Sequence, residues 1–171
     1  NFKVAQLGTL GIIAEGFEKN KTLTTPDPIT LHKILRDLSD KGFTHVVMEV
    51  SSHALDQLRV ADIDFDISVF TNLSKEHLDY HNDMETYFKT KSKLFRMMPI
   101  TSTSIVHTDD MYGKKMKLES SAPVLSISMK KKSDIYFDKI NCSLSGIKGI
   151  IKSTNKEISF NSALIGEFNS E

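Results

Sequence analysis

Apolar residues recur with two different periods along the first two thirds of the chain. Short apolar runs, several of them rich in β-branched residues, lie at residues 3–7, 44–50, 65–73 and 103–110. Between these runs, apolar residues recur at helical spacing over two further stretches, residues 28–41 and 83–98. Strands that alternate with amphipathic helices are typical of a parallel sheet with helices on its faces. We therefore predict an α/β fold of the doubly wound type, with a mostly parallel sheet whose strands are covered on both faces.

The ends of the two predicted helices carry recognisable signals. Asp27 precedes the first helix and Pro28 occupies its first position, where a capping carboxylate and a proline are favoured. Gly42 follows this helix, as glycine often does at a helix end. Pro99 ends the second helix, because proline lacks the amide hydrogen that a helix needs. The predicted helices therefore begin and end close to the limits of the apolar pattern.

From residue 121 the pattern changes to short stretches in which apolar and polar residues alternate. The stretches read "VLSISM", "DIYFDKI", "IKGIIKS" and "EISFNSALIG", with "KKKSD" and "STNKE" as two of the turns. Alternation of this kind, interrupted by tight turns, predicts antiparallel strands. We therefore divide the chain into an α/β part at residues 1–120 and a small antiparallel β subdomain at residues 121–168. Because the first strand has no lead-in and the last apolar segment stops abruptly, we expect the chain to be incomplete at both ends.

The composition excludes several classes of protein. Of the 171 residues, 22 are lysine or arginine and 22 are aspartate or glutamate, so the formal net charge is zero. A neutral chain gives no general reason to expect nucleic acid or an anionic membrane as a partner. No apolar run approaches the roughly 20 residues needed to span a bilayer, and no signal peptide is visible. The single cysteine, Cys142, rules out an internal disulfide and fits a reducing compartment, so we expect a cytoplasmic protein.

Polar residues gather where three of the predicted strands end. Residues 49–53 read Glu-Val-Ser-Ser-His, residues 71–72 read Thr-Asn, and residues 107–110 read His-Thr-Asp-Asp. The carboxyl ends of parallel strands lie at one edge of a sheet, which is where ligands bind in open sheets of this type. We therefore expect the three clusters to converge. The alternative is that these residues only cap helices and form turns, which their residue types also favour.

Two histidines follow the strand at residues 65–73 at a spacing of four. On a helix, His77 and His81 would share a face, which is a spacing that zinc-binding helices also use. The residues between them do not match the zinc-protease motif, and no cysteine lies nearby. A metal-dependent hydrolase that uses this pair is therefore kept only as an alternative. His77 is the more informative of the two, because it lies just beyond a strand end, near the edge that carries Glu49.

Lys91 points with the apolar residues of the second predicted helix. On that helix it shares a face with Phe88 and Phe95. The neighbouring Lys89 and Lys93 project elsewhere. One explanation is that the stem of Lys91 is buried and its ammonium group reaches the rim. The other is that Lys91 is held in a site, where it is paired or chemically altered.

Arginine and threonine side chains add candidate anion contacts. Arg59 lies close to Gln57 and to the Glu49 cluster, and its planar fork suits a carboxylate or a phosphate. Taken alone, such an arginine is more often part of a surface ion pair. Thr24 and Thr25 lie in the loop before the first helix, whose N-terminal amides favour an anion.

Five segments taken together resemble a known family. They read "LTTPDP", "MEVSSHALDQLRV", "VFTNLSKEHLDYH", "METYFKTKSKLF" and "LIGEFN". In this order they resemble the central, ATP-binding domain of the Mur ligases, from about Gln6 to Asn169. The segment that begins at Met48 points to the members that add the third residue of the peptidoglycan stem peptide. The resemblance implies a ligase that phosphorylates a substrate carboxylate with ATP and then lets an amine displace the phosphate.

The resemblance implies a metal site built on three residues. Glu49 would bind one Mg²⁺ ion and His77 would hold a second. Lys91 matches the lysine that family members carry as a carbamate, which would bind metal and take part in catalysis. A carbamate turns a long cationic side chain into an anionic oxygen ligand, which is the kind that Mg²⁺ prefers.

The resemblance also implies substrate contacts. Those with the UDP-N-acetylmuramoyl-dipeptide fall to Thr24, Thr25, Ser51, Gln57 and Arg59. By the same resemblance Arg59 would have a catalytic role as well, since a guanidinium can offset the charge that builds up during transfer. Contacts with the nucleotide fall to Asn72 and Asp109. The implied partners are therefore ATP, the muramoyl dipeptide and an amino acid, and we expect a monomer.

The sequence departs from the family pattern in several respects. The glycine-rich phosphate loop and the C-terminal domain of family members are missing from these 171 residues, so we expect this piece alone to be inactive. His107 stands where the family usually has asparagine. The added amino acid, whether diaminopimelate, lysine or another, is selected in the missing domain. A non-catalytic module that binds the muramoyl peptide is the alternative function, followed by the metal-dependent hydrolase.

Overall fold

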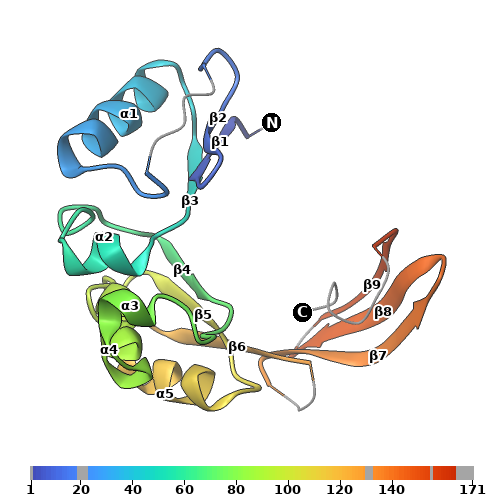
Figure 1. The fold of residues 1–171 in the computed structure, drawn as a ribbon. Coiled ribbons are helices and arrows are strands. Elements are labelled where there is room, and N and C mark those ends of the chain that lie inside the picture. Colours follow the sequence, from blue (N-terminus) through green and yellow to red (C-terminus); the bar gives the residue numbers. More distant parts are fainter. Residues whose placement is uncertain (1, 19–22, 130–132, 155, 165–171) are drawn as a thin grey trace. The chain divides into compact units, whose positions relative to one another are not determined.

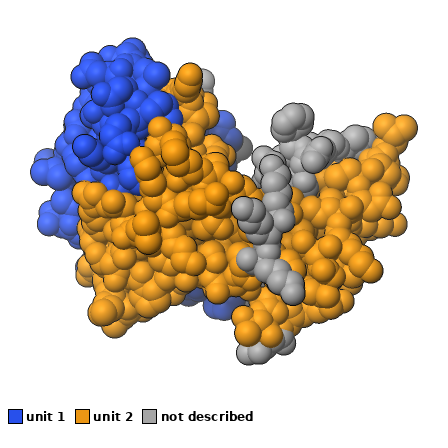
Figure 2. All heavy atoms as spheres, turned by 90° about the horizontal axis from the view of Figure 1, so that it is seen from below, with its two compact units in different colours: residues 1–63, 77–93 blue, residues 64–76, 94–171 orange. Residues whose placement is uncertain are grey.

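The structure is a computed structural model that describes residues 2–18, 23–129, 133–154 and 156–164. The chain forms two compact units, each built from two separate stretches (Figure 2). The first unit contains residues 1–63 and 77–93, and the second contains residues 64–76 and 94–171. Parts of the predicted turns "KKKSD" and "STNKE" lie outside the described residues, as do residues 165–169 of the segment "LIGEFN".

A three-stranded sheet forms the framework of the first unit (Figure 1). Its strand order is β2-β1-β3, with β1 at Val4–Gly8, β2 at Gly11–Ile13 and β3 at His45–Met48. β1 and β3 run parallel, with Leu7 opposite Met48, whereas β1 and β2 form an antiparallel hairpin. The chain therefore leaves β1 and β3 at the same edge of the sheet.

Helix α1 (Pro28–Asp40) connects the hairpin to β3 and supplies much of the core of the first unit. Its buried residues are Leu31, Ile34 and Leu38. Asp27 caps the helix by accepting a hydrogen bond from the amide of Thr30. Gly42 follows the helix with a φ of 76°, a conformation that glycine adopts without strain. The predicted start and stop signals of this helix are thus confirmed.

The first unit also contains three short or partial helices. They are α2 at Ser52–Asp56, α3 at Leu78–His81, and residues 84–93 of α4 at Met84–Arg96. Helix α4 was predicted from its amphipathic pattern, and that prediction is confirmed. No helix in the described part of the chain is long and apolar enough to cross a membrane.

A six-stranded mixed sheet forms the framework of the second unit (Figure 1). In spatial order its strands are β4 (Ile67–Phe70), β5 (Thr103–His107), β6 (Val124–Ser128), β7 (Ile135–Ser143), β8 (Gly146–Ser153) and β9 (Lys156–Ser162). Neighbouring strands from β4 to β7 run parallel, whereas β7, β8 and β9 form an antiparallel extension. Helix α5 (Met111–Glu119) connects β5 to β6. The predicted α/β class with a mostly parallel sheet and an antiparallel part is confirmed.

The prediction of an antiparallel strand at residues 124–128 is wrong. β6 pairs in parallel with both β5 and β7. The reason is helix α5, which the apolar pattern does not reveal because Gly113 and several charged residues interrupt it. A strand that follows a crossover helix joins the parallel part of the sheet. The division of the chain near residue 121 remains a prediction, but the sheet itself continues from β6 into β7.

Several strands are buried on only one face, which corrects the expectation of cover on both. On β4, Ser68 and Phe70 are buried. Ile67 and Val69, which alternate with them, are each 57% exposed, and Val47 on β3 is 62% exposed. The pleat points successive side chains to opposite faces, so one helical layer buries only every second residue. A continuous apolar run therefore overstates how far the described residues cover these strands.

Candidate functional site

The carboxyl ends of β1 and β3 bring Thr9 and Glu49 together in the first unit. Thr9 lies in the turn that joins β1 to β2, and Glu49 follows the last residue of β3. The backbone amide of Thr9 donates a hydrogen bond to Glu49 Oε2 at 3.3 Å, and the Thr9 hydroxyl donates to the same oxygen at 3.0 Å. The Glu49 carboxylate is thus held at the sheet edge where ligands are expected.

Thr25 fastens the loop before α1 to the same edge. Its side chain is buried, and its hydroxyl donates to the carbonyl oxygen of Glu49 at 2.8 Å. The same hydroxyl accepts a hydrogen bond from the amide of Ser51 at 3.0 Å. The hydroxyl oxygen of Thr24 lies 3.2 Å from that of Thr9. The two predicted threonines therefore both connect to the Glu49 segment, one through its main chain and the other through Thr9.

Ser51 caps helix α2, since its hydroxyl accepts a hydrogen bond from the amide of Ala54 at 3.2 Å. Asp110 caps α5 in the same way, with the amide of Gly113 at 2.7 Å. The alternative that strand-end residues serve as helix caps therefore holds for these two positions. Whether Ser51 also contacts a substrate stays a prediction.

Arg59 is held by neutral acceptors, which corrects the expectation of a surface ion pair. Its Nη1 donates to the carbonyl oxygen of Thr25 at 2.8 Å. Its Nε and Nη2 both donate to Gln57 Oε1, at 3.0 and 2.5 Å. Among the described residues, none forms an ion pair with Arg59. The two predicted substrate contacts Gln57 and Arg59 thus orient each other.

Lys91 points inward from helix α4, as its position among apolar residues predicts. The side chain is half-buried, and Nζ donates to the carbonyl oxygen of Val50 at 3.3 Å. Val50 follows Glu49, so the amine lies beside the segment that carries the candidate carboxylate. Lys93 projects elsewhere and forms an ion pair with Asp56 at 2.9 Å. The two lysines of one helix therefore have clearly different surroundings.

His77 adopts a left-handed backbone conformation directly before helix α3, with a φ of 56°. Its ring makes edge contacts with His53 and Tyr87, at centroid distances of 5.4 and 6.0 Å. Tyr87 lies one helical turn before Lys91 on α4, so His77 lies close to the helix that carries the candidate carbamate. His77 precedes the helix, so the helical spacing of His77 and His81 does not apply, although both rings contact His53 and Tyr87.

His81 makes structural contacts. It is buried, its Nε2 lies 2.8 Å from the Ser52 hydroxyl, and its ring stacks on Tyr87 with a centroid distance of 5.0 Å. Burial, followed by the neighbouring His53, lowers the pKa of His81 and favours its neutral form. Among the described residues, no group of three or more His, Cys, Asp or Glu side chains could hold a metal ion. The contacts of His81 with Ser52 and Tyr87 favour a structural role over the role of a zinc ligand.

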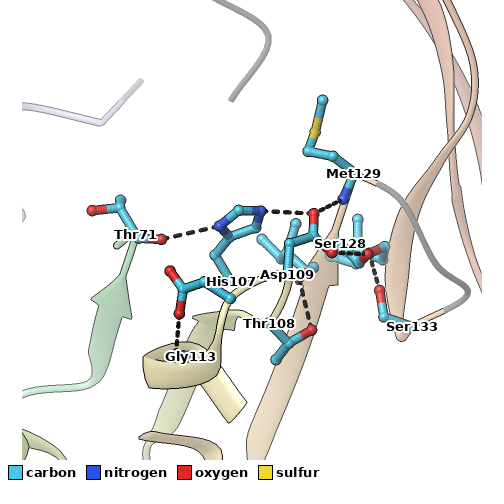
Figure 3. Close-up of polar contacts among 11 residues, drawn as sticks. Thr71, His107, Thr108, Asp109, Gly113, Ser128, Met129 and Ser133 are labelled. Carbon is cyan, nitrogen blue, oxygen red and sulfur yellow. Dashed lines mark hydrogen bonds and ion pairs between the residues drawn. The ribbon is translucent and has the colours of Figure 1, made fainter. Parts of the chain in front are cut away.

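In the second unit, His107 connects the ends of neighbouring strands (Figure 3). Its Nδ1 lies 3.1 Å from the carbonyl oxygen of Thr71, and its Nε2 lies 3.1 Å from Asp109 Oδ2. Asp109 also accepts hydrogen bonds from the hydroxyl of Ser128 and, at 2.7 Å, from the amide of Met129. Figure 3 shows the imidazole ring between the Thr71 carbonyl and the carboxylate. One side-chain network thus joins the ends of β4, β5 and β6.

The charge state of this network follows from its acceptors. Burial raises the pKa of the Asp109 carboxyl, but hydrogen bonds from Ser128, Met129 and His107 outweigh burial, so the pKa lies below its usual value. An ionised carboxylate and a backbone carbonyl can only accept hydrogen bonds. The Thr71 carbonyl and the Asp109 carboxylate are therefore both acceptors toward the ring of His107.

A polar pocket of about 500 Å³ adjoins this network in the second unit. It is lined by Thr108, Asp109, Lys114, Lys117, Ser126, Ser128, Ser133 and Asp134. Asp109, one of the two predicted nucleotide contacts, thus lies in the wall of a pocket. Asn72, the other, is exposed after the end of β4 and is not among the described residues that line the pocket.

The expected convergence of three polar clusters on one sheet edge is only partly observed. The clusters after β4 and β5 lie on neighbouring strands and are joined by His107. The Glu49 cluster belongs to the sheet of the first unit, so the prediction of a single sheet is wrong. The reason is that, within the described part of the chain, β3 pairs with β1 and β4 pairs with β5.

Sequence reasoning missed two contributors to these sites. Thr9 makes two of the hydrogen bonds to the Glu49 carboxylate, and its place after an apolar strand that runs parallel to β3 was the available signal. Ser128 binds Asp109 from the end of β6, which the sequence pattern assigned to an antiparallel subdomain. Strand orientation, rather than residue type, was the missing information in the second case.

Comparison with known proteins assigns the chain to one family. Residues 1–171 match the Mur ligase middle domain, and the chain belongs to this family. The UDP-N-acetylmuramoyl-L-alanyl-D-glutamate–2,6-diaminopimelate ligase of Geobacter metallireducens is 39% identical over 173 residues, which cover 95% of this chain and 34% of that protein. The ligase of the same name from Trichormus variabilis is 39% identical over 169 residues, covering 98% of this chain and 34% of that protein.

A solved structure gives the same result for the fold. A UDP-N-acetylmuramoyl-L-alanyl-D-glutamate–2,6-diaminopimelate ligase matches with a TM-score of 0.86 and 29% identity, over 99% of this chain and 35% of the solved chain. The chain thus spans about a third of the length of the proteins to which it is similar.

Proposed function

We propose that the full-length protein is an ATP-dependent amide-bond ligase of peptidoglycan precursor synthesis, which adds the third amino acid to UDP-N-acetylmuramoyl-L-alanyl-D-glutamate. Membership of the Mur ligase family supports this function, as do similar proteins that bear the name of such a ligase. The observation that carries the proposal is that Thr25 and Lys91 donate hydrogen bonds to consecutive backbone carbonyls, those of Glu49 and Val50, just after the end of β3.

The proposed reaction has two steps. ATP transfers its γ-phosphoryl group to a carboxylate oxygen of the muramoyl dipeptide, which gives ADP and an acyl phosphate. The amino group of the incoming amino acid then attacks the acyl carbon, forms the amide bond, loses a proton and expels inorganic phosphate. Negative charge builds up on oxygen atoms in both steps. The site therefore needs cationic and hydrogen-bond-donating groups that are already in place.

Arg59 is the proposed cationic group of the chain in this reaction. Gln57 and the Thr25 carbonyl fix the plane of its guanidinium before any substrate binds. A guanidinium that is already oriented needs little reorganisation when charge develops on a nearby oxygen. The proposed contacts with the muramoyl dipeptide are Thr24, Thr25, Ser51, Gln57 and Arg59, all of which belong to the first unit.

Lys91 takes part as a carbamate in this proposal. Its Nζ adds to CO₂ with loss of a proton, so an N–C bond forms and the side chain ends in anionic oxygens. Mg²⁺ keeps several of its waters and takes one or two carboxylate-type ligands from a protein, so Glu49 and a carbamate on Lys91 are a suitable pair. His77 offers a ring nitrogen to a second ion. When bound, Mg²⁺ would neutralise charge on phosphate oxygens.

Asn72 and Asp109 are the proposed nucleotide contacts of the second unit. Both follow ends of parallel strands, which is the usual position of a ligand in such a sheet. Asp109 is further supported by its place in the wall of the polar pocket. The proposal as a whole implies ATP, the UDP-N-acetylmuramoyl-dipeptide and an amino acid as partners of a monomeric, cytoplasmic enzyme that requires Mg²⁺.

The test uses the purified full-length protein. Phosphate release is measured with ATP, Mg²⁺, the muramoyl dipeptide and one amino acid, and diaminopimelate is tried first because the similar proteins are named for it. We expect phosphate release that requires every component, and we expect mass spectrometry to detect an amide product. Binding of the muramoyl dipeptide without turnover would instead support the non-catalytic binding module. Absence of both binding and turnover would refute the proposal.

Two lysines of helix α4 provide a matched pair of variants for this assay. Lys91→Ala is expected to lower kcat by about 100-fold or more, because it removes the proposed metal ligand. Lys93→Ala removes an exposed ion pair with Asp56 and is expected to change kcat by less than about threefold. Equal effects of the two substitutions would contradict the role proposed for Lys91.

A further inference from the structure

We infer that Thr9 is a positioning residue for Glu49 and that Gly8 leaves the space that this contact requires. The inference rests on the proposed function, because it treats Glu49 as a ligand of the divalent cation. It concerns the turn between β1 and β2, to which neither the sequence pattern nor the family resemblance assigns a role. Its basis is the set of hydrogen bonds at the carboxyl ends of two neighbouring parallel strands.

Thr9 directs both of its donors to a single oxygen of the Glu49 carboxylate. The amide and the hydroxyl donate to Oε2 at 3.3 and 3.0 Å. Within the described part of the chain, every side-chain hydrogen bond observed for this carboxylate falls on Oε2. Two donors on one oxygen fix the rotation of the carboxylate group and direct Oε1 away from the turn. A cation that binds Oε1 therefore meets a ligand whose orientation is already set.

Gly8 makes the close approach of the carboxylate sterically acceptable. A Cβ atom at position 8 would lie 3.2 Å from Glu49 Oε2 and 3.5 Å from Glu49 Cβ. The backbone of Gly8 is not in the left-handed region, so conformational freedom is not the reason for glycine here. The reason is space, because a methyl group would require the Glu49 carboxylate, which Thr9 holds, to shift by a few tenths of an ångström.

The direction of the hydrogen bonds also determines what Thr24 offers to a ligand. The Thr9 hydroxyl donates to Glu49 Oε2, so its single proton is committed to that contact. In the 3.2 Å contact between Thr9 and Thr24, the hydroxyl of Thr24 must then be the donor. Thr24 consequently presents oxygen lone pairs to its surroundings. The substrate group that contacts its hydroxyl is therefore a donor, such as an amide N–H or a sugar O–H.

The experiment measures divalent-cation binding to the full-length protein without ATP, using Mn²⁺ detected by electron paramagnetic resonance. Thr9→Val removes the hydroxyl at similar volume and keeps the amide, and it is expected to weaken Mn²⁺ binding by about 10–100-fold. Thr9→Ser restores the hydroxyl and is expected to recover affinity. Leu10→Ala, at a side chain that is 70% exposed in the same turn, is the matched control and is expected to bind normally.

Three outcomes separate this inference from the proposed function. Wild-type affinity in Thr9→Val would overturn the inference. Wild-type affinity in Glu49→Gln would show that Glu49 is not a ligand, so the proposed metal site itself would fail. If Thr9→Val does not fold, Gly8→Ala decides the question, because it displaces the carboxylate while it keeps the hydroxyl. Normal binding in Gly8→Ala, with an unchanged urea midpoint, would then overturn the inference.

Discussion

At the residue scale, hydrogen bonds orient the charged side chains of both candidate sites, and in the first unit the partners are uncharged groups. Glu49 is held by Thr9, and Arg59 by Gln57 and a carbonyl. Asp109 accepts from a hydroxyl, an amide and an imidazole. Hydrogen bonds to ionised groups are shorter and stronger than those between neutral groups, so they fix orientation without neutralising the charge. The charges are thus left available for a ligand.

Asp109→Asn tests this arrangement through its pH dependence. The pKa of Asp109 lies below its ordinary value of 3.8, so the ionised side chain adds stability above about pH 4 and loses that contribution as the pH falls through the folded-state pKa. We expect the substitution to lower the free energy of unfolding by about 1.5–3 kcal/mol at pH 7, because the amide cannot accept from all three donors.

Urea unfolding of the wild type and of Asp109→Asn at a series of pH values between 7 and 3 checks this prediction. The difference between the two proteins should shrink toward acidic pH, because Asp109 of the wild type then takes up a proton. A difference that stays constant over the whole range would contradict the proposed role of the charge.

Carbamylation of Lys91 is a second prediction at this scale. Incubation of the full-length protein with ¹³C-bicarbonate and Mg²⁺ should produce a carbamate carbon resonance, because the amine of the half-buried Lys91 lies at the carbonyl of Val50, the residue after the proposed metal ligand Glu49. Lys91→Arg should abolish the resonance. Lys93→Arg should retain it, since the amine of Lys93 is paired with Asp56 as a cation. A signal that survives in Lys91→Arg would assign the modification to another residue.

At the element scale, local signals predicted the helices better than they predicted the sheet. Asp27 and Pro28 signal the start of α1, and α4 has an uninterrupted amphipathic pattern. The apolar pattern of helix α5 is interrupted, although Asp110 caps the helix. A cap followed by a weak pattern could not be separated from a polar turn. The missed helix then led to the wrong orientation for β6.

The candidate site shows the same division between local and non-local information. The inward direction of Lys91 follows from helical spacing within a few residues of sequence. The contact between Thr9 and Glu49 joins residues 40 positions apart, and it depends on the pairing of β1 with β3. His77 lies before helix α3 with a left-handed backbone, so a helical spacing rule could not place its ring.

Removal of the α5 cap should measure how far this helix depends on Asp110. We expect Asp110→Ala to lower the free energy of unfolding by about 0.5–2 kcal/mol, because the amide of Gly113 loses its acceptor. Met111→Ala, at an adjacent side chain that is 59% exposed, serves as the control and should change stability by less than about 0.5 kcal/mol. Equal values in urea titrations of the two variants would argue against the cap.

A pair of valines on neighbouring strands tests the assignment of the two sheet faces. Val106 on β5 is fully buried, whereas Val69 on β4 is 57% exposed. Val106→Thr places a hydroxyl in an apolar core and should cost about 1–3 kcal/mol. Val69→Thr should stay within about 0.5 kcal/mol of the wild type. Comparable losses for the two substitutions, measured by thermal or urea unfolding, would mean that the second face is also covered.

At the scale of the whole molecule, the candidate chemistry is divided between the two units. The proposed metal and muramoyl contacts belong to the first unit, and the proposed nucleotide contacts belong to the second. The 171 residues contain no G-x-x-x-x-G-K-[ST] segment, the sequence that cradles the phosphates of ATP in proteins of this chemistry. Residues that could orient a substrate are therefore present without the backbone amides and the lysine that bind the transferred phosphate.

The 171-residue chain, produced by itself, should consequently release no phosphate from ATP above the background rate. Phosphoryl transfer depends almost entirely on positioning and charge stabilisation, so a polypeptide without the phosphate-binding segment lacks the main source of acceleration. The assay compares this chain with the full-length protein at equal concentration, with and without Mg²⁺. Robust Mg²⁺-dependent turnover by the 171 residues alone would show that their own lysines and amides suffice to bind the phosphates.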